Sequence, residues 1–400
     1  MTADNSASLR ILLAVTVPIT VRTVLRGQAT FLHSRGHEVH IATSEGKAFA
    51  ENQSDALVAE RHVVPFSRRL FDPLADFRAL IAILRILRHS RPDVVVAGTP
   101  KAGLITMLAA RALGVPRIYV LHGLRLEGAT GLTFRLMRIA EKAACSLADC
   151  VAVVGDQLLE KSRQLGVVSV EKSFVLGSGS ASGIDVHRFR PVDANGRAKM
   201  REEAGLPTDS FVVGFVGRLT PDKGLSAIVE AWPLVLSAVP EALLMVVGGI
   251  DATGGITDAL VTTLDDLPHV VRLGEVADPE RTLPMLDLLI LPSKREGLPT
   301  VVLEAAACGI PAVMTDVTGA RDAIIDGETG LIVPLGRSDM LASAVVGLAD
   351  EHSRTQMGAA ARRRVCAHFA QADVCQRYAR LYEHIAHSQQ TNPQIEGGSR

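Results

Sequence analysis

The sequence has little of what marks a membrane-spanning, disulfide-rich or base-stacking protein. Only 4% of its 400 residues are aromatic, which argues against a nucleic-acid binder that stacks bases on aromatic rings. No stretch approaches the roughly 18 consecutive apolar residues that span a bilayer. The cysteines are odd in number and form no C-x-x-C pair, which indicates reduced thiols that mostly fill cores in a cytosolic protein. They are Cys145, Cys150, Cys308, Cys366 and Cys375.

The start of the chain lacks the features of a secretory signal. Met1–Ser8 is polar and carries Asp4, with no basic residue before Leu9. The apolar run Ile11–Val17 is followed by Pro18, which indicates a strand and not a signal-peptide core. We therefore expect a cytoplasmic protein, with the inner face of the cell membrane as a second place of action.

The chain also has almost no net charge, but the balance of basic and acidic residues differs between its halves. The formal net charge is −1, while residues 1–190 carry +8 and residues 191–400 carry −9. A basic half and an acidic half predict different partners for the two halves. A length of 400 residues exceeds one ordinary core and predicts two domains.

Short apolar strands alternate with helical stretches in both halves, which predicts an α/β fold with two doubly wound parallel sheets. The expected strands are Ile11–Val17, Val39–Ala42, Asp93–Val96, Ile118–Leu121, Cys150–Val154, Phe211–Phe215, Ala242–Val247, Val270–Leu273, Leu288–Leu291 and Ala312–Met314. The expected helices are Gly27–Arg35, Phe77–Arg88, Ala102–Leu113, Glu141–Leu147, Leu225–Val239 and Thr300–Cys308. The Gly/Ser-rich start of Gly177–Pro191 marks this segment as the linker.

The first chemical motif is Gly217–Gly224, which joins a predicted strand to a predicted helix. Doubly wound domains hold anions at such junctions. The glycines allow close approach of a ligand to the backbone, and Arg218 and Lys223 supply positive charge suited to phosphate. The alternative is a surface loop with solvated charges.

The second motif, Pro292–Glu304, joins the next strand and helix of the same half. Thr300 is the predicted N-cap, so that N–H groups of the first helical turn can meet a diphosphate. Glu296 lies in the loop, within reach of sugar hydroxyls, and Glu304 lies in the helix, where it can accept hydrogen bonds from a ribose. The alternatives are a solvated loop charge and a helix-dipole carboxylate.

Together the pair Gly217-Arg218…Lys223-Gly224 and Glu296-x7-Glu304 resembles the retaining glycosyltransferases of family 4, which have the GT-B fold. The resemblance covers roughly residues 9–387. Its further matches in the second half and linker are Thr318-Gly319-Ala320-Arg321-Asp322, Asp326–Pro334, Gly183-Ile184-Asp185 and Arg188-Phe189. Three segments of the first half resemble the branch of the family that builds bacterial polysaccharides. They are Thr99–Gly103, Leu121–Arg125 and Gly177–Ser180.

The resemblance implies two Rossmann-like domains that face a cleft, with residues 1–190 binding the acceptor and residues 191–375 the nucleotide sugar. Residues 376–388 would form a helix that packs back on the first domain, before a disordered tail at 389–400. Many family members carry a Gly-Gly pair after the first strand, where this chain has Val17-Pro18-Ile19-Thr20-Val21. The acceptor contacts of that loop therefore do not carry over.

The same resemblance implies roles for the motif residues. Arg218 and Lys223 would bind the donor diphosphate, Glu304 the ribose and Glu296 the hydroxyls of the transferred sugar. His122 would act from the first domain as a further catalytic residue. The other donor-binding positions are Gly217, Gly297, Leu298, Thr300 and Val301, and the acceptor-binding positions are Lys101 and Arg125.

The implied function is retaining transfer of a hexose from a nucleotide diphosphate sugar, UDP-linked by default, to a saccharide or lipid-linked acceptor in surface polysaccharide or glycoconjugate synthesis. No cofactor is expected, no nucleic acid, and no metal, since no Asp-x-Asp dyad stands in a suitable position. The alternatives are a secondary-metabolite acceptor, a sugar-nucleotide 2-epimerase and a two-lobed binding protein. A dinucleotide dehydrogenase would need G-x-G-x-x-G after the first strand, which Ala14–Gly27 lacks.

One segment bears on the acceptor. Seven arginines stand in the segment that runs from Arg61 to Arg91, both included, and the helix expected at Phe77–Arg88 mixes arginines with apolar residues. Such a helix can lie on an anionic membrane surface and meet a lipid-linked acceptor. The alternative is a buried helix with arginines at its solvent edge.

Overall fold

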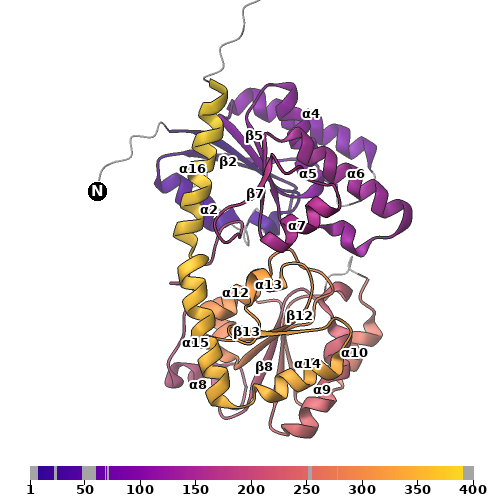
Figure 1. Ribbon diagram of the computed structural model, residues 1–400, viewed down its shortest axis with the longest axis vertical. Coiled ribbons are helices and arrows are strands. Elements are labelled where there is room, and N and C mark those ends of the chain that lie inside the picture. Colours follow the sequence, from indigo (N-terminus) through magenta and orange to yellow (C-terminus); the bar gives the residue numbers. More distant parts are fainter. Residues whose placement is uncertain are drawn as a thin grey trace, which may run out of the picture. The chain divides into compact units, whose positions relative to one another are not determined.

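A computed structural model describes residues 8–21, 25–46, 60–67, 69, 72–250, 255–276 and 278–390 (Figure 1). The chain divides into two compact units. The first unit is Met1–Gly183 together with Gln371–Arg400, and the second unit is Ile184–Ala370. Each unit is built on one parallel sheet.

The first unit contains a seven-stranded sheet in the order β3-β2-β1-β4-β5-β6-β7. Helices α2 and α16 pack together on one face, and α4, α5 and α6 form a layer on the other (Figure 1). Its strands are β1 (Arg10–Ala14), β2 (Glu38–Thr43), β3 (Glu60–Val63), β4 (Val94–Ala97), β5 (Arg117–Leu121), β6 (Cys150–Val153) and β7 (Ser173–Val175). Its helices are α1 (Pro18–Thr20), α2 (Arg26–Ser34), α4 (Pro73–Ser90), α5 (Pro100–Ala112), η2 (Arg125–Gly128), α6 (Gly131–Leu147), α7 (Asp156–Gln164) and α16 (Gln371–Gln390).

The second unit contains a six-stranded sheet in the order β10-β9-β8-β11-β12-β13. Helices α9, α10 and α14 cover one face, and α12 and α15 pack together on the other (Figure 1). Its strands are β8 (Val212–Val216), β9 (Leu243–Val247), β10 (Val270–Gly274), β11 (Leu288–Leu291), β12 (Ala312–Thr315) and β13 (Gly330–Val333). Its helices are α8 (Ala194–Glu203), η3 (Pro221–Lys223), α9 (Leu225–Ala238), α10 (Asp258–Asp265), α11 (Pro279–Thr282), η4 (Leu283–Met285), α12 (Thr300–Ala307), α13 (Ala320–Ala323), α14 (Ser338–Gly347) and α15 (Glu351–His368).

The central strands confirm the predicted α/β class with two doubly wound sheets. Every residue of β8, β9, β11 and β12 is buried, because helices cover both faces of the sheet. This burial explains why the strands are continuous apolar runs in the sequence. The first strand ends at Ala14, short of the predicted Val17, and α6 begins at Gly131, ten residues before the predicted start at Glu141.

The boundaries between the units differ from those expected near residues 190 and 375. Ile184 bridges Ala370, and its N–H donates to the carbonyl of Phe369 at 2.7 Å. Ile184 and Phe189 are both buried in the core of the second unit. The segment expected to be a linker thus belongs to the second unit from Ile184 onward, and α16 begins at Gln371 and packs against α2. Of the tail expected at 389–400, residues 391–400 lie outside the described residues.

The cysteine thiols and the helices both bear on what the composition predicts. All five cysteines are free thiols and four of them are buried, which confirms that they mostly fill cores. Burial raises the pKa of Cys150 and of Cys308 to about 12, so neither is a ready nucleophile. Among the described helices, none is long and apolar enough to cross a bilayer.

Candidate active site in the second unit

The two predicted motifs meet at the carboxyl edge of the second sheet. Strands β8 and β11 are neighbours there, and the order of strands in the sequence reverses between them. Such a reversal is the place where open α/β sheets bind ligands. Gly217–Gly224 follows β8 and Pro292–Pro299 follows β11, so both loops leave the sheet at this point.

Three polar contacts join these loops. The ammonium of Lys223 lies 2.6 Å from Oε1 of Glu296, and both side chains are largely buried, with exposed fractions of 21% and 11%. Nη2 of Arg295 donates to Oδ2 of Asp222 at 2.8 Å. The N–H of Lys294 donates to the carbonyl of Asp222 at 2.7 Å. The structure therefore brings Lys223 and Glu296 together, as the prediction of a shared site requires.

The charges near Asp222 are balanced in favour of its ionised form. Burial acts to raise the pKa of Asp222, but the hydroxyl of Thr220 and the guanidinium of Arg295 outweigh it and leave the pKa below its ordinary value. The loop after β8 thus carries a carboxylate that holds Arg295, while Lys223 and the exposed Arg218 carry its positive charges.

Two glycines set how closely the loops approach one another. Gly224 has φ of +77°, and a Cβ there would lie 1.9 Å from the carbonyl oxygen of Pro292. Gly319, after β12, has φ of +82°, and its Cβ would lie 1.9 Å from the carbonyl oxygen of Gly297. Only a residue without a side chain fits either position. The glycines therefore allow the loops after β8 and β12 each to pack closely against the loop after β11.

The N-terminus of α12 differs from the prediction. The N-cap is Pro299, and Thr300, expected to be the cap, is the first helical residue. Pro299 is extended at ψ 92° and accepts from the N–H of Val302 at 3.0 Å, while no side chain caps this end of the described helix. The first turn holds no acidic residue. The N–H groups of Thr300 and Val301, with the positive end of the helix dipole, are therefore placed to meet an anion.

Glu304 lies within α12 and is partly buried. Burial raises its pKa to about 7, Arg188 acts in the opposite direction, and Glu280 adds to the rise. Arg188 is itself paired with Glu280, its Nη2 lying 2.7 Å from Oε2 of that residue. Arg188 belongs to a motif of the sequence, but its action on Glu304 could not be predicted there, because only the fold brings the two residues together.

This raised pKa predicts a pH-dependent stability. Between pH 4.5, the ordinary pKa of the group, and about pH 7 the folded chain holds a proton on Glu304 that the unfolded chain releases, so this group makes stability fall as the pH rises through that window. We expect Glu304→Gln to be more stable than the parent at pH 8 by roughly 3 kcal/mol and equal to it near pH 4. Urea unfolding at both pH values measures the difference; the same difference at both values would contradict the assignment.

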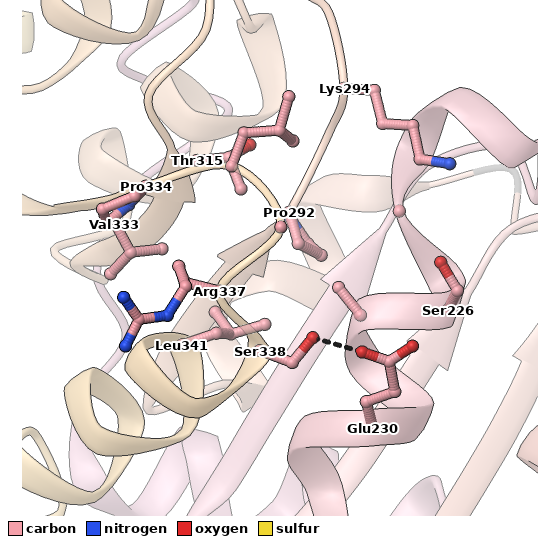
Figure 2. Close-up of a pocket in the computed structure, with 14 residues that line it drawn as sticks. Ser226, Glu230, Pro292, Lys294, Thr315, Val333, Pro334, Arg337, Ser338 and Leu341 are labelled. Carbon is pink, nitrogen blue, oxygen red and sulfur yellow. Dashed lines mark hydrogen bonds between the residues drawn. The ribbon is translucent and has the colours of Figure 1, made fainter.

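A hollow lies beside the switch point (Figure 2). It has a volume of about 340 Å³ and is lined by the start of α9, by Pro292, Lys294 and Thr315, and by the segment after β13. Within it Ser338 donates to Oε2 of Glu230 at 2.6 Å (Figure 2). Gly224, Pro292 and Lys294 of the two motif loops line it, whereas Glu296 and Glu304 do not.

The remaining predicted residues lie in the first unit. His122 follows β5, and burial lowers its pKa to about 4, so the imidazole is neutral at physiological pH. Lys101 donates to both carboxylate oxygens of Asp76, at 2.7 and 2.8 Å, which offsets its charge. Arg125 is exposed in η2. Their expected roles in catalysis and acceptor binding remain predictions.

The fold and this cluster define a class: two Rossmann-like units in one chain, the second with cationic loops and a helix N-terminus at its switch point. Comparison with known proteins gives the family. Residues 210–351 match the model of glycosyl transferases group 1, and residues 20–179 match the glycosyl transferase 4-like domain. The chain is 33% identical to the capsular polysaccharide biosynthesis glycosyltransferase CapM of Staphylococcus aureus over 345 residues, which cover 86% of this chain and 88% of that protein. The chain belongs to the group 1 glycosyltransferases.

Two further comparisons agree. The chain is 23% identical over 338 residues to the UDP-Gal:alpha-D-GlcNAc-diphosphoundecaprenol alpha-1,3-galactosyltransferase of Escherichia coli, covering 83% of this chain and 85% of that one. The crystal structure of HepE of Anabaena in complex with UDP and glucose superposes with a TM-score of 0.80 at 20% identity, covering 94% of this chain and all of that one. The predicted GT-B fold, glycosyltransferase class and polysaccharide-building branch are confirmed, and the epimerase and binding-protein alternatives are set aside.

Proposed function

We propose that this chain transfers a hexose from a UDP-linked sugar, with retention of the anomeric configuration, to a lipid-linked or free saccharide in surface polysaccharide synthesis. The observation that carries the proposal is the pairing of Lys223 with Glu296 beside the uncapped N-terminus of α12. A diphosphate needs fixed positive charge, and a sugar needs a carboxylate that accepts from its hydroxyls. Lys223 supplies the positive charge and Glu296 the carboxylate, and the two groups lie 2.6 Å apart.

The donor diphosphate would be held by the N–H groups of Thr300 and Val301 and by Arg218 and Lys223. As the bond between the anomeric carbon and the phosphate oxygen breaks, negative charge grows on the departing diphosphate, and preorganised cations stabilise that charge. Glu304 would accept from the ribose hydroxyls. Gly217, Gly297 and Leu298 would complete the pocket through their backbone.

The surroundings of Glu296 support retention of the anomeric configuration. Glu296 is held 2.6 Å from an ammonium, which suits it to accept from sugar hydroxyls and makes it a poor covalent nucleophile. We propose that the acceptor attacks from the face that the diphosphate leaves, without a covalent sugar–enzyme intermediate. No metal or cofactor takes part in this proposal, because Arg218, Lys223 and the end of α12 supply the positive charge.

The test is a transfer assay with UDP-, GDP- and dTDP-linked hexoses and a diphosphate-lipid saccharide acceptor. We expect one UDP-linked hexose to support turnover, and proton NMR of the early product to give the anomeric coupling of the donor. An inverted anomer would overturn retention, and turnover only with a GDP-linked sugar would overturn the choice of base. Transfer to a small secondary metabolite, but not to the lipid-linked acceptor, would favour the alternative acceptor class.

We propose further that the layer of α4, α5 and α6 lies against an anionic membrane surface. In the expected helix Phe77–Arg88, now part of α4, Ala79, Ile83 and Leu87 are buried while the arginines are exposed. Leu74 and Phe77 of α4 are exposed at 60% and 59%, and α6 adds Leu132, Leu136 and Ile139 with exposed fractions of 71%, 50% and 64%. On α6 the apolar side chains are interleaved with three exposed cations, which favours anionic lipid. They are Arg135, Arg138 and Lys142.

Vesicle co-sedimentation tests this surface. We expect the parent to bind phosphatidylglycerol vesicles and not phosphatidylcholine vesicles, and the double variant Leu136→Glu with Ile139→Glu to bind at least about 10-fold more weakly. Leu234→Glu, at an exposed leucine of α9 in the second unit, is the matched control and should bind as the parent does. Equal binding by the double variant would remove α6 from the membrane surface.

A further inference from the structure

A cluster of two histidines and a glutamate lies on the first unit, outside every residue assigned to transfer. It is formed by His40 on β2 and by Glu60 and His62 on β3. The two strands are parallel, with His40 opposite Glu60 and Ala42 opposite His62. Residues two apart on a strand point to the same face, so the register places all three side chains on one face of the sheet. We propose that this cluster is a binding site for a divalent transition-metal ion, zinc above all.

The distances between the three ligand atoms fit zinc. Nδ1 of His40 lies 3.3 Å from Nε2 of His62. Oε2 of Glu60 lies 3.8 Å from the first nitrogen and 3.6 Å from the second. A point equidistant from these atoms is about 2.1 Å from each, the length of zinc–nitrogen and zinc–carboxylate bonds. An ion fits among the three atoms with little movement of the strands.

The hydrogen bond that His40 makes through Nε2 leaves its Nδ1 as the nitrogen that can bind a metal. Its Nε2 lies 2.9 Å from Oε1 of Glu38. A carboxylate accepts only, so Nε2 carries the proton and Nδ1, which faces His62 and Glu60, presents its lone pair. A carboxylate behind a ligating imidazole fixes its tautomer and raises its basicity, as at known zinc sites. Glu38 thus acts as a positioning residue for His40.

Burial and charge support the same assignment. The His40 and His62 side chains are 5% and 10% exposed, and their rings stack at a centroid distance of 5.5 Å. Glu60 is 46% exposed, which leaves a path for the ion and room for a water ligand. Two neutral imidazoles with the carboxylates of Glu38 and Glu60 would balance the two charges of the ion. Nitrogen and oxygen donors together suit zinc more than calcium or magnesium.

The site would join β3 to the rest of the sheet. This strand has four residues and lies at the sheet edge, with β2 as its neighbour. A bound ion would take two ligands from β3 and one from β2. It would therefore stabilise the pairing of the edge strand β3 with β2. The site lies in the first unit and leaves the proposed metal-free donor chemistry of the second unit unchanged.

The test is metal binding to the full chain, stripped of metal and free of any histidine tag. Zinc is titrated in competition with a chromophoric chelator, and cobalt is titrated separately to record its visible absorption. We expect one ion per chain, affinity for zinc reduced at least 100-fold in His62→Gln, and a 10- to 100-fold reduction in Glu60→Gln and in Glu38→Gln. His33→Gln, at an exposed histidine of α2, is the matched control and should bind as the parent does.

The parent protein alone can refute the proposal. Zinc binding weaker than about 10 µM, or no cobalt absorption typical of four ligands, would overturn it whatever the variants do. Unchanged affinity in Glu60→Gln and His62→Gln, with circular dichroism showing both folded, would place any bound ion elsewhere. A melting temperature that rises with zinc in the parent, but not in His62→Gln, would support it.

Discussion

Replacing Lys223 by alanine is expected to lower kcat for glycosyl transfer by about 10²–10³-fold, because removal of one preorganised donor to a developing anion costs about 2.7–4 kcal/mol of transition-state stabilisation. The ammonium sits at the switch point, 2.6 Å from Glu296 and largely buried. In the proposed mechanism it stabilises the departing diphosphate more than the bound donor. The loss should therefore appear in kcat more than in KM.

A merely structural role of Lys223 predicts a different result. If Lys223 only holds Glu296 in place, its removal should have no further effect once Glu296 has been changed to glutamine. If it also acts on the diphosphate, the double variant should be at least about 10-fold slower than Glu296→Gln alone. Lys294→Ala removes an exposed ammonium from the adjoining loop and should stay within about threefold of the parent. Activity of Lys223→Ala within fivefold of the parent would contradict the assignment.

Gly224→Ala is expected to destabilise the second unit by about 3 kcal/mol or more. The left-handed conformation at φ +77° alone costs an alanine roughly 1–2 kcal/mol. In addition, the new Cβ would lie 1.9 Å from the carbonyl oxygen of Pro292, which is backbone and has no rotamer to adopt. The two loops would have to separate, and the bond from the N–H of Lys294 to the carbonyl of Asp222 would be lost.

Gly327→Ala isolates the effect of that close approach. Gly327 has φ of +78°, but nothing lies within 4 Å of the point that a Cβ would occupy there. We expect this control to lose only the conformational part, about 1–2 kcal/mol. Urea unfolding followed by the single tryptophan, Trp232 in the core of the second unit, measures both variants. Equal losses in the two variants would show that the contact between the loops has no energetic weight.

The fold was largely predictable because the central strands of a covered parallel sheet are apolar throughout. Leu288–Leu291 was predicted at both ends, since it is buried on both faces and bounded by Asp287 and Pro292. Strand β3 was missed, because Glu60–Val63 is a half-exposed edge strand with charged and imidazole side chains. The start of α6 was missed for a related reason: its first two turns are mostly exposed.

The candidate site was predictable as a set of residues but not as a geometry. Glu296 and Lys223 were both identified at strand ends, yet only the order of β8 and β11 in the sheet brings them to 2.6 Å. The preference for threonine at N-caps placed the cap at Thr300, whereas the helix begins one residue earlier than that rule implies, directly after Pro299. The influence of Arg188 on Glu304 links residues more than a hundred positions apart, which no local pattern records.

A donor site at the switch point is tested by calorimetric titration of UDP and GDP into the parent, Glu304→Ala and Glu230→Ala. Glu230 is the matched control, because it lies on α9, outside both motif loops, and its carboxylate accepts from Ser338. We expect one UDP site per chain, affinity at least about 10-fold lower in Glu304→Ala, and no change in Glu230→Ala. Binding lost in Glu230→Ala but kept in Glu304→Ala, or no binding of either nucleotide to the folded parent, would contradict a donor site built around Glu304.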